Sequence, residues 1–547
     1  MERAAIARHL EEIALLLSLK GENPFAVRAF ENAAHTVADL PDLPQRLAEG
    51  RLQDVPGIGK AIRQVLEDLA TTGRSRAMDG LRAELPPGLP ELVKVPGLGP
   101  KRIAALWKEQ GITSLDELEN AIRDGALKGA QGFGPKTTTK LMEGLAFVRA
   151  TAGRFLLPKA LEHAERVREA FLASADAARA GVTRVELAAD LRRGMESACG
   201  IVLAVACERP RDLSPFREEL GVPPVSLVAS RPEAFGTAWL LATGSSSHLA
   251  LLNERDGGAA LTRPAASEEE IYERLGLPFI PPELREGKDE LELAASGALP
   301  ELIGAGDLGG AFHVHSTYSD GKATLREVLQ RAVELGWSFV GISDHSPAAA
   351  YANGLTPERV DKQWAELDAL RAEFPSLTVF RGTEADILTD GSIDYGDEFL
   401  ARFDFVIASV HSSLQLDSAR QTERLIRAVR NPRVTLLGHA TSRLLLERNG
   451  FEVDMPAVLA AAGEAGCGVE SNGAPRRMEL DWRLGAVARR HGVFTSANPD
   501  AHDLPALSHV RWAATVARKA GFRRADVLNA GDAASVGRRL AELKSRR

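Results

Sequence analysis

The chain has 547 residues, of which 44% are hydrophobic and 26% are charged, and its formal net charge is −8. This size and composition are typical of a soluble protein with several globular domains, and the charge excludes a basic field over the whole surface. No apolar run reaches the ~18 residues that cross a bilayer, and acids flank the first apolar run, which is untypical of a secretory signal. Because the three cysteines are isolated, we expect a reducing, cytoplasmic location without disulfides and without a membrane partner.

The first 150 residues are predicted to be helical. Ile6, Leu10 and Ile13 recur at the three- and four-residue spacing of a helix face. Short Gly/Pro turns separate the expected helices, and we place a first helical domain at residues 1–78 and a second at residues 79–150.

Three turns in this helical region share one pattern, in VPGIGK, VPGLGPK and GFGPK. Glycine allows backbone angles that a side chain would forbid, and amides at the start of a helix suit a phosphate oxygen. The alternative is a purely structural turn between helices. The phosphate interpretation assigns contacts to Gly57, Gly59, Lys60, Gly97, Gly99, Lys101, Gly132, Gly134 and Lys136.

Residues 151–285 mix helix-like and strand-like stretches, and residues 286–308 are predicted to be a connector. In LRRGMESACGIVLAVA, a charged turn with Arg192 and Arg193 precedes an apolar run that predicts a buried strand. A positively charged turn before a strand often positions a phosphate, and the chemistry then needs acids on the strand to hold metal ions. This strand carries none.

Residues 309–547 alternate short apolar runs with helix-like segments, which predicts a parallel α/β sheet or barrel. Polar residues follow the apolar runs, where the sites of such barrels lie. Strand alternation places the two histidines of FHVHS on one face. Ligands of this kind suit Mn²⁺, Zn²⁺ or Fe²⁺ and predict phosphoester hydrolysis. The nine candidate metal-binding and catalytic residues are His313, His315, Asp320, His345, Glu384, His411, His439, Asp500 and His502.

In this order, FHVHSTYSDG, ISDHS, GTEADIL, ASVHSS, LLGHATSRLL and PDAH resemble the polymerase and histidinol phosphatase (PHP) domain. The three turns resemble helix-hairpin-helix motifs, which grip the DNA backbone. The whole chain is similar to bacterial family X DNA polymerases. The resemblance implies a multidomain α+β protein with a helix-hairpin-helix region, a nucleotidyltransferase-like palm and a distorted (β/α)7 PHP barrel.

The resemblance also implies a centre of three metal ions, with Mn²⁺ favoured over Zn²⁺ and Fe²⁺. The activity it implies is 3′-5′ exonucleolytic cutting, with abasic-site and 3′-phosphate processing as further activities. Residue by residue, it assigns one ion to His313, His315, Glu384 and Asp500, a second to Asp320, His345 and His439, and a third to Glu384, His411 and His502.

Working polymerases of this family carry Asp-x-Asp on the strand after the LRRG turn and a third acid on a later strand. Here the aligned positions hold Gly200, Val202 and Ser226, so we expect polymerase activity to be lost. Asp190 stands where the phosphate turn of the family has serine. Val65 occupies the position of the Schiff-base lysine, which argues against lyase activity.

The expected partner is DNA with gaps, single-stranded 3′ ends or abasic sites, bound by a nucleoid-associated monomer. Arg192 and Arg193 are expected to remain as ion-pair or DNA-backbone contacts. Glu470 and Asn472 are placed at the mouth of the site, and Arg443 is a candidate phosphate contact. Two other functions stay open: a small-molecule phosphatase of the histidinol-phosphate type, and a DNA-binding repair scaffold without catalysis.

Overall fold

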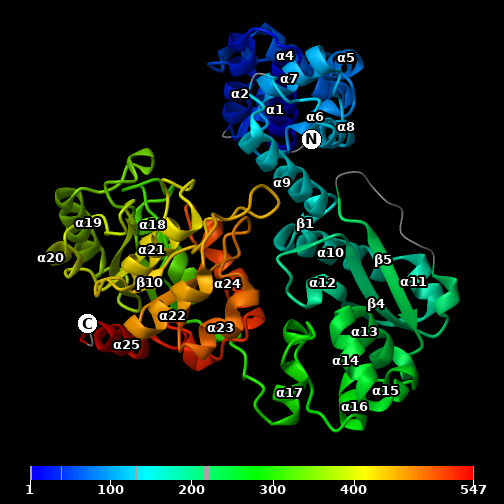
Figure 1. Cartoon of the computed structure of the whole chain (residues 1–547), viewed down its shortest axis with the longest axis vertical. Coiled ribbons are helices and arrows are strands. Elements are labelled where there is room, and N and C mark those ends of the chain that lie inside the picture. The colour runs from blue at the N-terminus through cyan, green and yellow to red at the C-terminus, as the bar shows by residue number, and fades with distance from the viewer. Residues whose placement is uncertain (1–2, 39, 131, 214–221, 546–547) are drawn as a thin grey trace. The chain divides into compact units, whose positions relative to one another are not determined.

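A computed structural model describes residues 3–38, 40–130, 132–213 and 222–545 of the chain. The chain forms two compact units, Met1–Ala152 and Gly153–Arg547, and each is described by itself. Most of their helices and some of their strands are labelled in Figure 1. No helix in these ranges combines the length and apolar character that a bilayer crossing requires.

The first unit is helical, as predicted. Leu10, Leu66, Leu89 and Ile103 are completely or almost completely buried in one apolar cluster that joins its helices. The helices are α1 (Arg3–Lys20), α2 (Pro24–Ala38), α3 (Leu43–Ala48), α4 (Lys60–Thr72), α5 (Arg76–Glu84), α6 (Leu89–Leu92), α7 (Pro100–Gln110), α8 (Leu115–Arg123) and α9 (Pro135–Thr151).

The second unit begins with a three-stranded sheet in the order β2-β4-β5, whose middle strand is the apolar run predicted after the LRRG turn. β4 runs antiparallel to β2 and parallel to β5. Its Ile201, Leu203 and Val205 are fully buried. The elements here are β1 (Phe155–Leu156), α10 (Leu157–Leu172), α11 (Ala175–Ala180), β2 (Val182–Leu187), α12 (Ala189–Arg192), β3 (Ser197–Ala198), β4 (Ile201–Cys207), β5 (Val225–Ser230) and α13 (Phe235–Thr243).

A small helical region follows the sheet and has its own apolar cluster around Leu252, Ile271 and Tyr272. The fully buried guanidinium of Arg285 pairs with Glu268 at 2.7 Å, and this bidentate geometry satisfies both buried charges. The helices are α14 (Ser246–Asp256), α15 (Ala259–Thr262), α16 (Glu268–Arg274) and α17 (Glu290–Ala295).

The rest of the chain forms seven parallel strands in the sequential order β6 to β12, which confirms the predicted α/β barrel. A parallel bridge between Val314 and Ala501 links the two ends of the sheet, so the barrel is nearly closed. The strands are β6 (Gly310–Ala311), β7 (Phe339–Ile342), β8 (Thr378–Asp386), β9 (Phe405–Ser409), β10 (Leu436–Leu437), β11 (Gly468–Asn472) and β12 (Thr495–Asn498). The helices are α18 (Leu325–Glu334), α19 (Pro357–Leu370), α20 (Asp397–Leu400), α21 (Ser418–Val429), α22 (Met455–Ala465), α23 (Gly485–Arg490), α24 (Val510–Lys519) and α25 (Ala533–Ser545).

The barrel core explains two of its glycines. Phe312 and Phe405 lie with ring centroids 4.8 Å apart in a cluster of phenylalanines. A Cβ on Gly382 would lie 2.1 Å from the Phe405 ring, and one on Gly341 would lie 2.7 Å from it. The strands therefore need glycine at these two positions to admit the aromatic ring.

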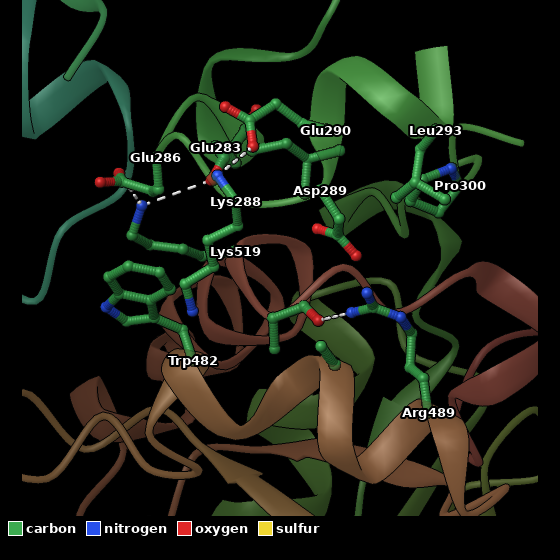
Figure 2. A pocket seen from close by; sticks show the side chains of 13 residues that line it. Glu283, Glu286, Lys288, Asp289, Glu290, Leu293, Pro300, Trp482, Arg489 and Lys519 are labelled. Atoms are coloured by element: carbon green, nitrogen blue, oxygen red, sulfur yellow. Dashed lines mark hydrogen bonds and ion pairs between the residues drawn. The ribbon is translucent and has the colours of Figure 1, made fainter. Parts of the chain in front are cut away.

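Within the second unit, ion pairs join the LRRG turn and the connector to the barrel, and Figure 2 shows the side chains of Glu286 and Lys519 among them. Glu286 accepts hydrogen bonds from Lys519 at 2.6 Å and from Arg193 at 2.9 Å. Trp482 packs under the Lys519 ammonium, 4.3 Å from its ring centroid. Glu286, Trp482 and Lys519 border a small cavity of about 40 Å³ at the junction.

Arg192 and Arg193, expected as ion-pair or DNA-backbone contacts, both make ion pairs within the protein. Arg192 makes a bidentate pair with Glu268 at 2.6 and 2.7 Å and lies over the Trp239 ring. Both arginine side chains are nearly buried, at 12% and 10% exposure. Their guanidinium groups face the carboxylates of Glu268 and Glu286, as the ion-pair alternative expects.

Candidate metal centre and DNA-contact turns

The nine candidate ligands lie together where the barrel strands end. The histidines and acids come from separate strands or from the loops that follow them, because parallel strands present their carboxyl ends at one edge. His313, His315, His345, Glu384, His439 and Asp500 are buried, whereas the side chains of Asp320 and His502 are 31% and 39% exposed and that of His411 is 9% exposed.

Glu384, at the end of β8, is the centre of the cluster. One carboxylate oxygen lies 3.3 Å from His313 Nε2 and 3.0 Å from His345 Nδ1. The other lies 3.3 Å from His411 Nε2 and 2.9 Å from His439 Nε2. His315 Nε2 lies 3.6 Å from the first oxygen, so this one carboxylate contacts five imidazoles, an arrangement suited to bridging ions.

The side chains group differently from the assignment that the resemblance implied. Asp320 was expected with His345 and His439; its carboxylate lies 3.6 Å from His345, but its second neighbour is His502, at 3.5 Å. A backbone hydrogen bond from Lys322 to His502 ties the Asp320 loop to the end of β12. The three groups that can each hold an ion are His315, Asp320, His345 and His502; His313, His315 and Asp500; and His345, Glu384 and His411.

The position of His439 has a related cause. It follows β10, which lies between β9 and β11, so it comes beside His411 with ring centroids 5.2 Å apart. Its Nε2 atom contacts Glu384 rather than Asp320. The order of the strands, which spacing along the sequence does not give, thus decides which ligands meet.

The side chains present fit divalent metal ions. His313 Nε2, both ring nitrogens of His315 and His439 Nδ1 are buried without a hydrogen-bond partner among the described residues. Buried polar atoms left in this way are costly unless another group satisfies them. A set of imidazoles and carboxylates without thiolate suits Mn²⁺, Zn²⁺ or Fe²⁺.

A second layer of acids holds the imidazoles in place. Glu470 lies 2.6 Å from His313 Nδ1, and Asp386 lies 2.7 Å from His411 Nδ1. Asn472 donates to Glu470 at 3.0 Å and to Asp500 at 3.1 Å. Glu470 and Asn472 were expected at the mouth of the site, but both are fully buried and act as supports. Sequence reasoning missed Asp386, although its two-residue spacing from Glu384 on one strand was a usable signal.

The cluster shifts the titration of its own members. Burial disfavours charge, but the surrounding histidines hold the pKa of Glu384 well below its usual value. Burial also opposes the charging of His411, yet the carboxylates of Glu384 and Asp386 raise its pKa to about 10. Protons and metal ions therefore compete for the same imidazoles.

Two arginines near the cluster differ in role. Arg443, expected to contact phosphate, donates to the Arg477 carbonyl at 3.0 Å and pairs with Asp481 at 3.3 Å, so it holds a loop. Arg477, which sequence reasoning missed, lies with Nε 3.3 Å from Asp500. Its Nη1 atom is buried without a hydrogen-bond partner in the described chain. Arg477 is thus a cation at the cluster that still has a free donor.

The three predicted turns share one geometry. Their first glycines, Gly57, Gly97 and Gly132, have φ angles of 83°, 83° and 86°, a region that favours glycine. The second glycines, Gly59, Gly99 and Gly134, are the N-caps of α4, α7 and α9. Ile58, Leu98 and Phe133 are buried between them, and Lys60, Lys101 and Lys136 are exposed. Each turn therefore presents helix-start amides and a lysine to solvent.

The positions aligned with polymerase acids lie at the β4–β5 pair. Gly200 precedes β4, and a Cβ there would lie 2.8 Å from the Pro224 carbonyl oxygen. Val202 is directly opposite Ser226 in the register. Asp190 is held by Arg193 at 2.7 Å. All groups of three or more possible metal ligands found among the described residues belong to the barrel.

Comparison with known proteins agrees with this organisation. Residues 1–75 match a helix-hairpin-helix domain, 89–146 a SAM-like helix-hairpin-helix tandem, 241–286 the DNA polymerase beta thumb and 311–449 the PHP domain. A protein of Bacillus subtilis (strain 168) named DNA polymerase/3'-5' exonuclease PolX is 33% identical over 97% of this chain and 98% of its own length. Probable phosphatases of Caldicellulosiruptor saccharolyticus and Aliivibrio fischeri are each 30% identical over 35% of this chain, and over 78% and 76% of their own lengths.

Helix-hairpin-helix regions, a polymerase thumb and a PHP barrel define a DNA-binding enzyme of the phosphoesterase or nucleotidyltransferase class. The chain belongs to the family X DNA polymerases that carry a PHP domain.

Proposed function

We propose that the protein is a metal-dependent DNA-repair nuclease that removes nucleotides from 3′ ends with its PHP barrel. The observation that carries this proposal is the gathering of nine histidine and carboxylate side chains, several with buried unpartnered nitrogens, at one edge of the barrel. We propose Mn²⁺ as the ion and three ions as the full complement. Gapped DNA, single-stranded 3′ ends and abasic sites are the proposed substrates of a monomeric protein, with 3′-phosphate removal as a further activity.

The nine cluster residues would hold the ions, which when bound polarise a phosphate and activate water. Glu470 and Asp386 fix the rings of His313 and His411 through hydrogen bonds to Nδ1, leaving each Nε2 turned toward Glu384. Arg477 offers its free guanidinium donor to a phosphate oxygen, which offsets the negative charge of the acids. The hairpin turns bind the strand through its backbone and leave the bases unread.

We further propose that polymerase activity is lost. Two-metal nucleotidyl transfer needs carboxylates, and glycine, valine and serine occupy the aligned positions 200, 202 and 226. The arginines of the neighbouring turn are engaged by Glu268 and Glu286, so they do not compensate.

A 5′-labelled primer–template incubated with Mn²⁺ and all four nucleotides tests both proposals. We expect shortening of the primer and no extension. The His315→Ala variant should lose cutting while it still binds DNA. His491→Ala, which changes an exposed histidine of the same barrel outside the cluster, should behave as wild type. Extension without shortening would contradict both proposals.

A small-molecule phosphatase remains the second candidate, because the probable phosphatases match the part of the chain that holds the cluster. A kcat/KM for p-nitrophenyl phosphate that greatly exceeds the value for a DNA 3′ end would favour it. A purified protein without metal by elemental analysis, and without cutting after Mn²⁺ is added, would instead favour a repair scaffold.

A further inference from the structure

Tyr351 stands out among the four tyrosines of the chain. The hydroxyls of Tyr272, Tyr318 and Tyr395 bond to His248, Glu366 and the Leu355 carbonyl, respectively. The Tyr351 hydroxyl makes no hydrogen bond within the described part of the chain, and the side chain is 71% exposed. A single exposed ring is common on protein surfaces, so the inference depends on where this ring lies.

The ring lies at the edge of the metal-type cluster. Its centroid is 6.3 Å from the His345 ring and 6.2 Å from the His411 ring, at interplanar angles of 57° and 69°. One part of the ring thus contacts the two histidines, while its exposed part faces solvent. A molecule that reaches the cluster from solvent on this side meets the ring first.

The segment that carries Tyr351 is held in place. The neighbours Ala349 and Ala352 are buried, and Leu355 N donates to the His345 carbonyl at 2.8 Å. Gly354 N donates to the Ala349 carbonyl at 3.2 Å, which closes the turn. A Cβ on Gly354 would lie 1.9 Å from the Ser346 carbonyl oxygen, so this close approach requires glycine. The ring is therefore presented by a fixed backbone, and little order must be gained on binding.

We propose that Tyr351 is the platform on which the base of the 3′-terminal nucleotide stacks, which makes it a positioning residue for the proposed nuclease reaction. This inference rests on the proposed function. Stacking on an aromatic ring accepts every base, because each base has a π face. A terminal base can stack on Tyr351 only when it has left the duplex, so the platform selects frayed or single-stranded 3′ ends and adds no sequence preference.

The test compares a single-stranded oligonucleotide that ends in a normal nucleotide with one that ends in a baseless tetrahydrofuran residue. For wild type we expect the normal end to have a KM about tenfold lower than the baseless end. Tyr351→Ala should remove this difference with little change in kcat, and Tyr351→Phe should keep it. Val333→Ala shortens another exposed side chain of the barrel and is the control. It should keep the difference in KM between the normal and the baseless end.

Stopped-flow mixing with an oligonucleotide that carries 2-aminopurine at its 3′ end gives a readout that does not depend on cutting. In Mn²⁺ we expect a fast loss of fluorescence on stacking for wild type and Tyr351→Phe, and none for Tyr351→Ala. An equal loss in Tyr351→Ala, or none in wild type, overturns the inference. A loss of fluorescence without any later cutting would support stacking on Tyr351 and contradict the proposed nuclease activity.

Discussion

Val202 on β4 lies directly opposite Ser226 on β5, so the positions that align with two of the three polymerase acids are neighbours in space. Two acids placed there would face one another across a parallel strand pair, as a shared metal site needs. The present pair offers one apolar side chain and one hydroxyl. The strand geometry of a nucleotidyltransferase is thus kept, while the chemistry that we propose for the protein belongs to the barrel.

Gly200, the third position that aligns with a polymerase acid, predicts an effect on stability. In Gly200→Asp, the new Cβ would lie 2.8 Å from the Pro224 carbonyl oxygen and 3.2 Å from the Pro224 ring. We expect this overpacking to lower the free energy of unfolding by about 1–3 kcal/mol, measured by urea denaturation. Gly297→Asp is the control for adding the same side chain, since a Cβ at Gly297 meets nothing within 4 Å, although its φ of 70° adds some strain. Equal stability of Gly200→Asp and wild type would show that the β4–β5 end still accepts an acid.

Removal of the carboxylate behind His313 should weaken metal binding. Glu470 fixes the ring through the 2.6 Å contact at Nδ1 and is itself held by Asn472 and Asn498. We expect Glu470→Gln to reduce Mn²⁺ affinity about 10- to 100-fold, measured by titration calorimetry. Glu464→Gln removes an exposed glutamate on α22 and should leave the affinity unchanged. An unchanged affinity in Glu470→Gln would mean that packing alone orients His313.

The sequence was sufficient to predict the barrel and the helical region, because strand–helix alternation and the repeated Gly-x-Gly turns are local patterns. It also named the nine cluster residues, which lie where each apolar run ends. It could not show that Asp320 meets His502 rather than His439, because that depends on strand order and on the loop hydrogen bond from Lys322. Nor could it show that Arg193 would find Glu286 and lie near Lys519, since these residues are far apart in the chain.

That long-range contact predicts how the second unit is stabilised. Glu286 accepts from Arg193 at 2.9 Å and from Lys519, drawn beside it in Figure 2, at 2.6 Å. Lys519 is almost fully buried. Glu286→Gln would leave two nearly buried cations without their shared carboxylate. We expect a loss of about 3 kcal/mol in the free energy of unfolding, measured by guanidinium denaturation. Glu292→Gln, at an exposed site on the nearby α17, should cost little; similar curves for both variants would contradict this role.

The buried His248 predicts a pH dependence of stability. Burial lowers its pKa below the usual value, and the neutral ring can donate from Nδ1 to Glu290 at 2.8 Å and accept at Nε2 from the Tyr272 hydroxyl at 3.0 Å. The unfolded chain therefore binds a proton near pH 6.5 that the folded chain refuses, so stability falls as pH drops below that value. The slope reaches up to about 1.4 kcal/mol per pH unit.

Urea denaturation from pH 8 to pH 5 measures this contribution as the difference between wild type and His248→Gln. We expect the variant to be less stable at pH 8 and to lose less stability on acidification. His491→Gln, at an exposed histidine, should keep the slope of wild type. Parallel curves for wild type and His248→Gln would show that the pKa of His248 is the same in the folded and the unfolded chain, and would contradict this prediction.

The hairpin turns predict a salt dependence of DNA binding. Lys60, Lys101 and Lys136 are exposed beside helix-start amides, so each can release a counterion when it neutralises a phosphate. Replacing all three by Gln should weaken binding equally for unrelated sequences and reduce the slope of log K against log[salt] by about 3, one for each lysine. Fluorescence anisotropy with two oligonucleotides of different sequence measures both effects. Lys159→Gln, outside the turns, should leave the slope unchanged. A triple variant that kept the wild-type slope would show that the amides alone hold the backbone, because amide contacts add affinity without releasing the counterions of a lysine.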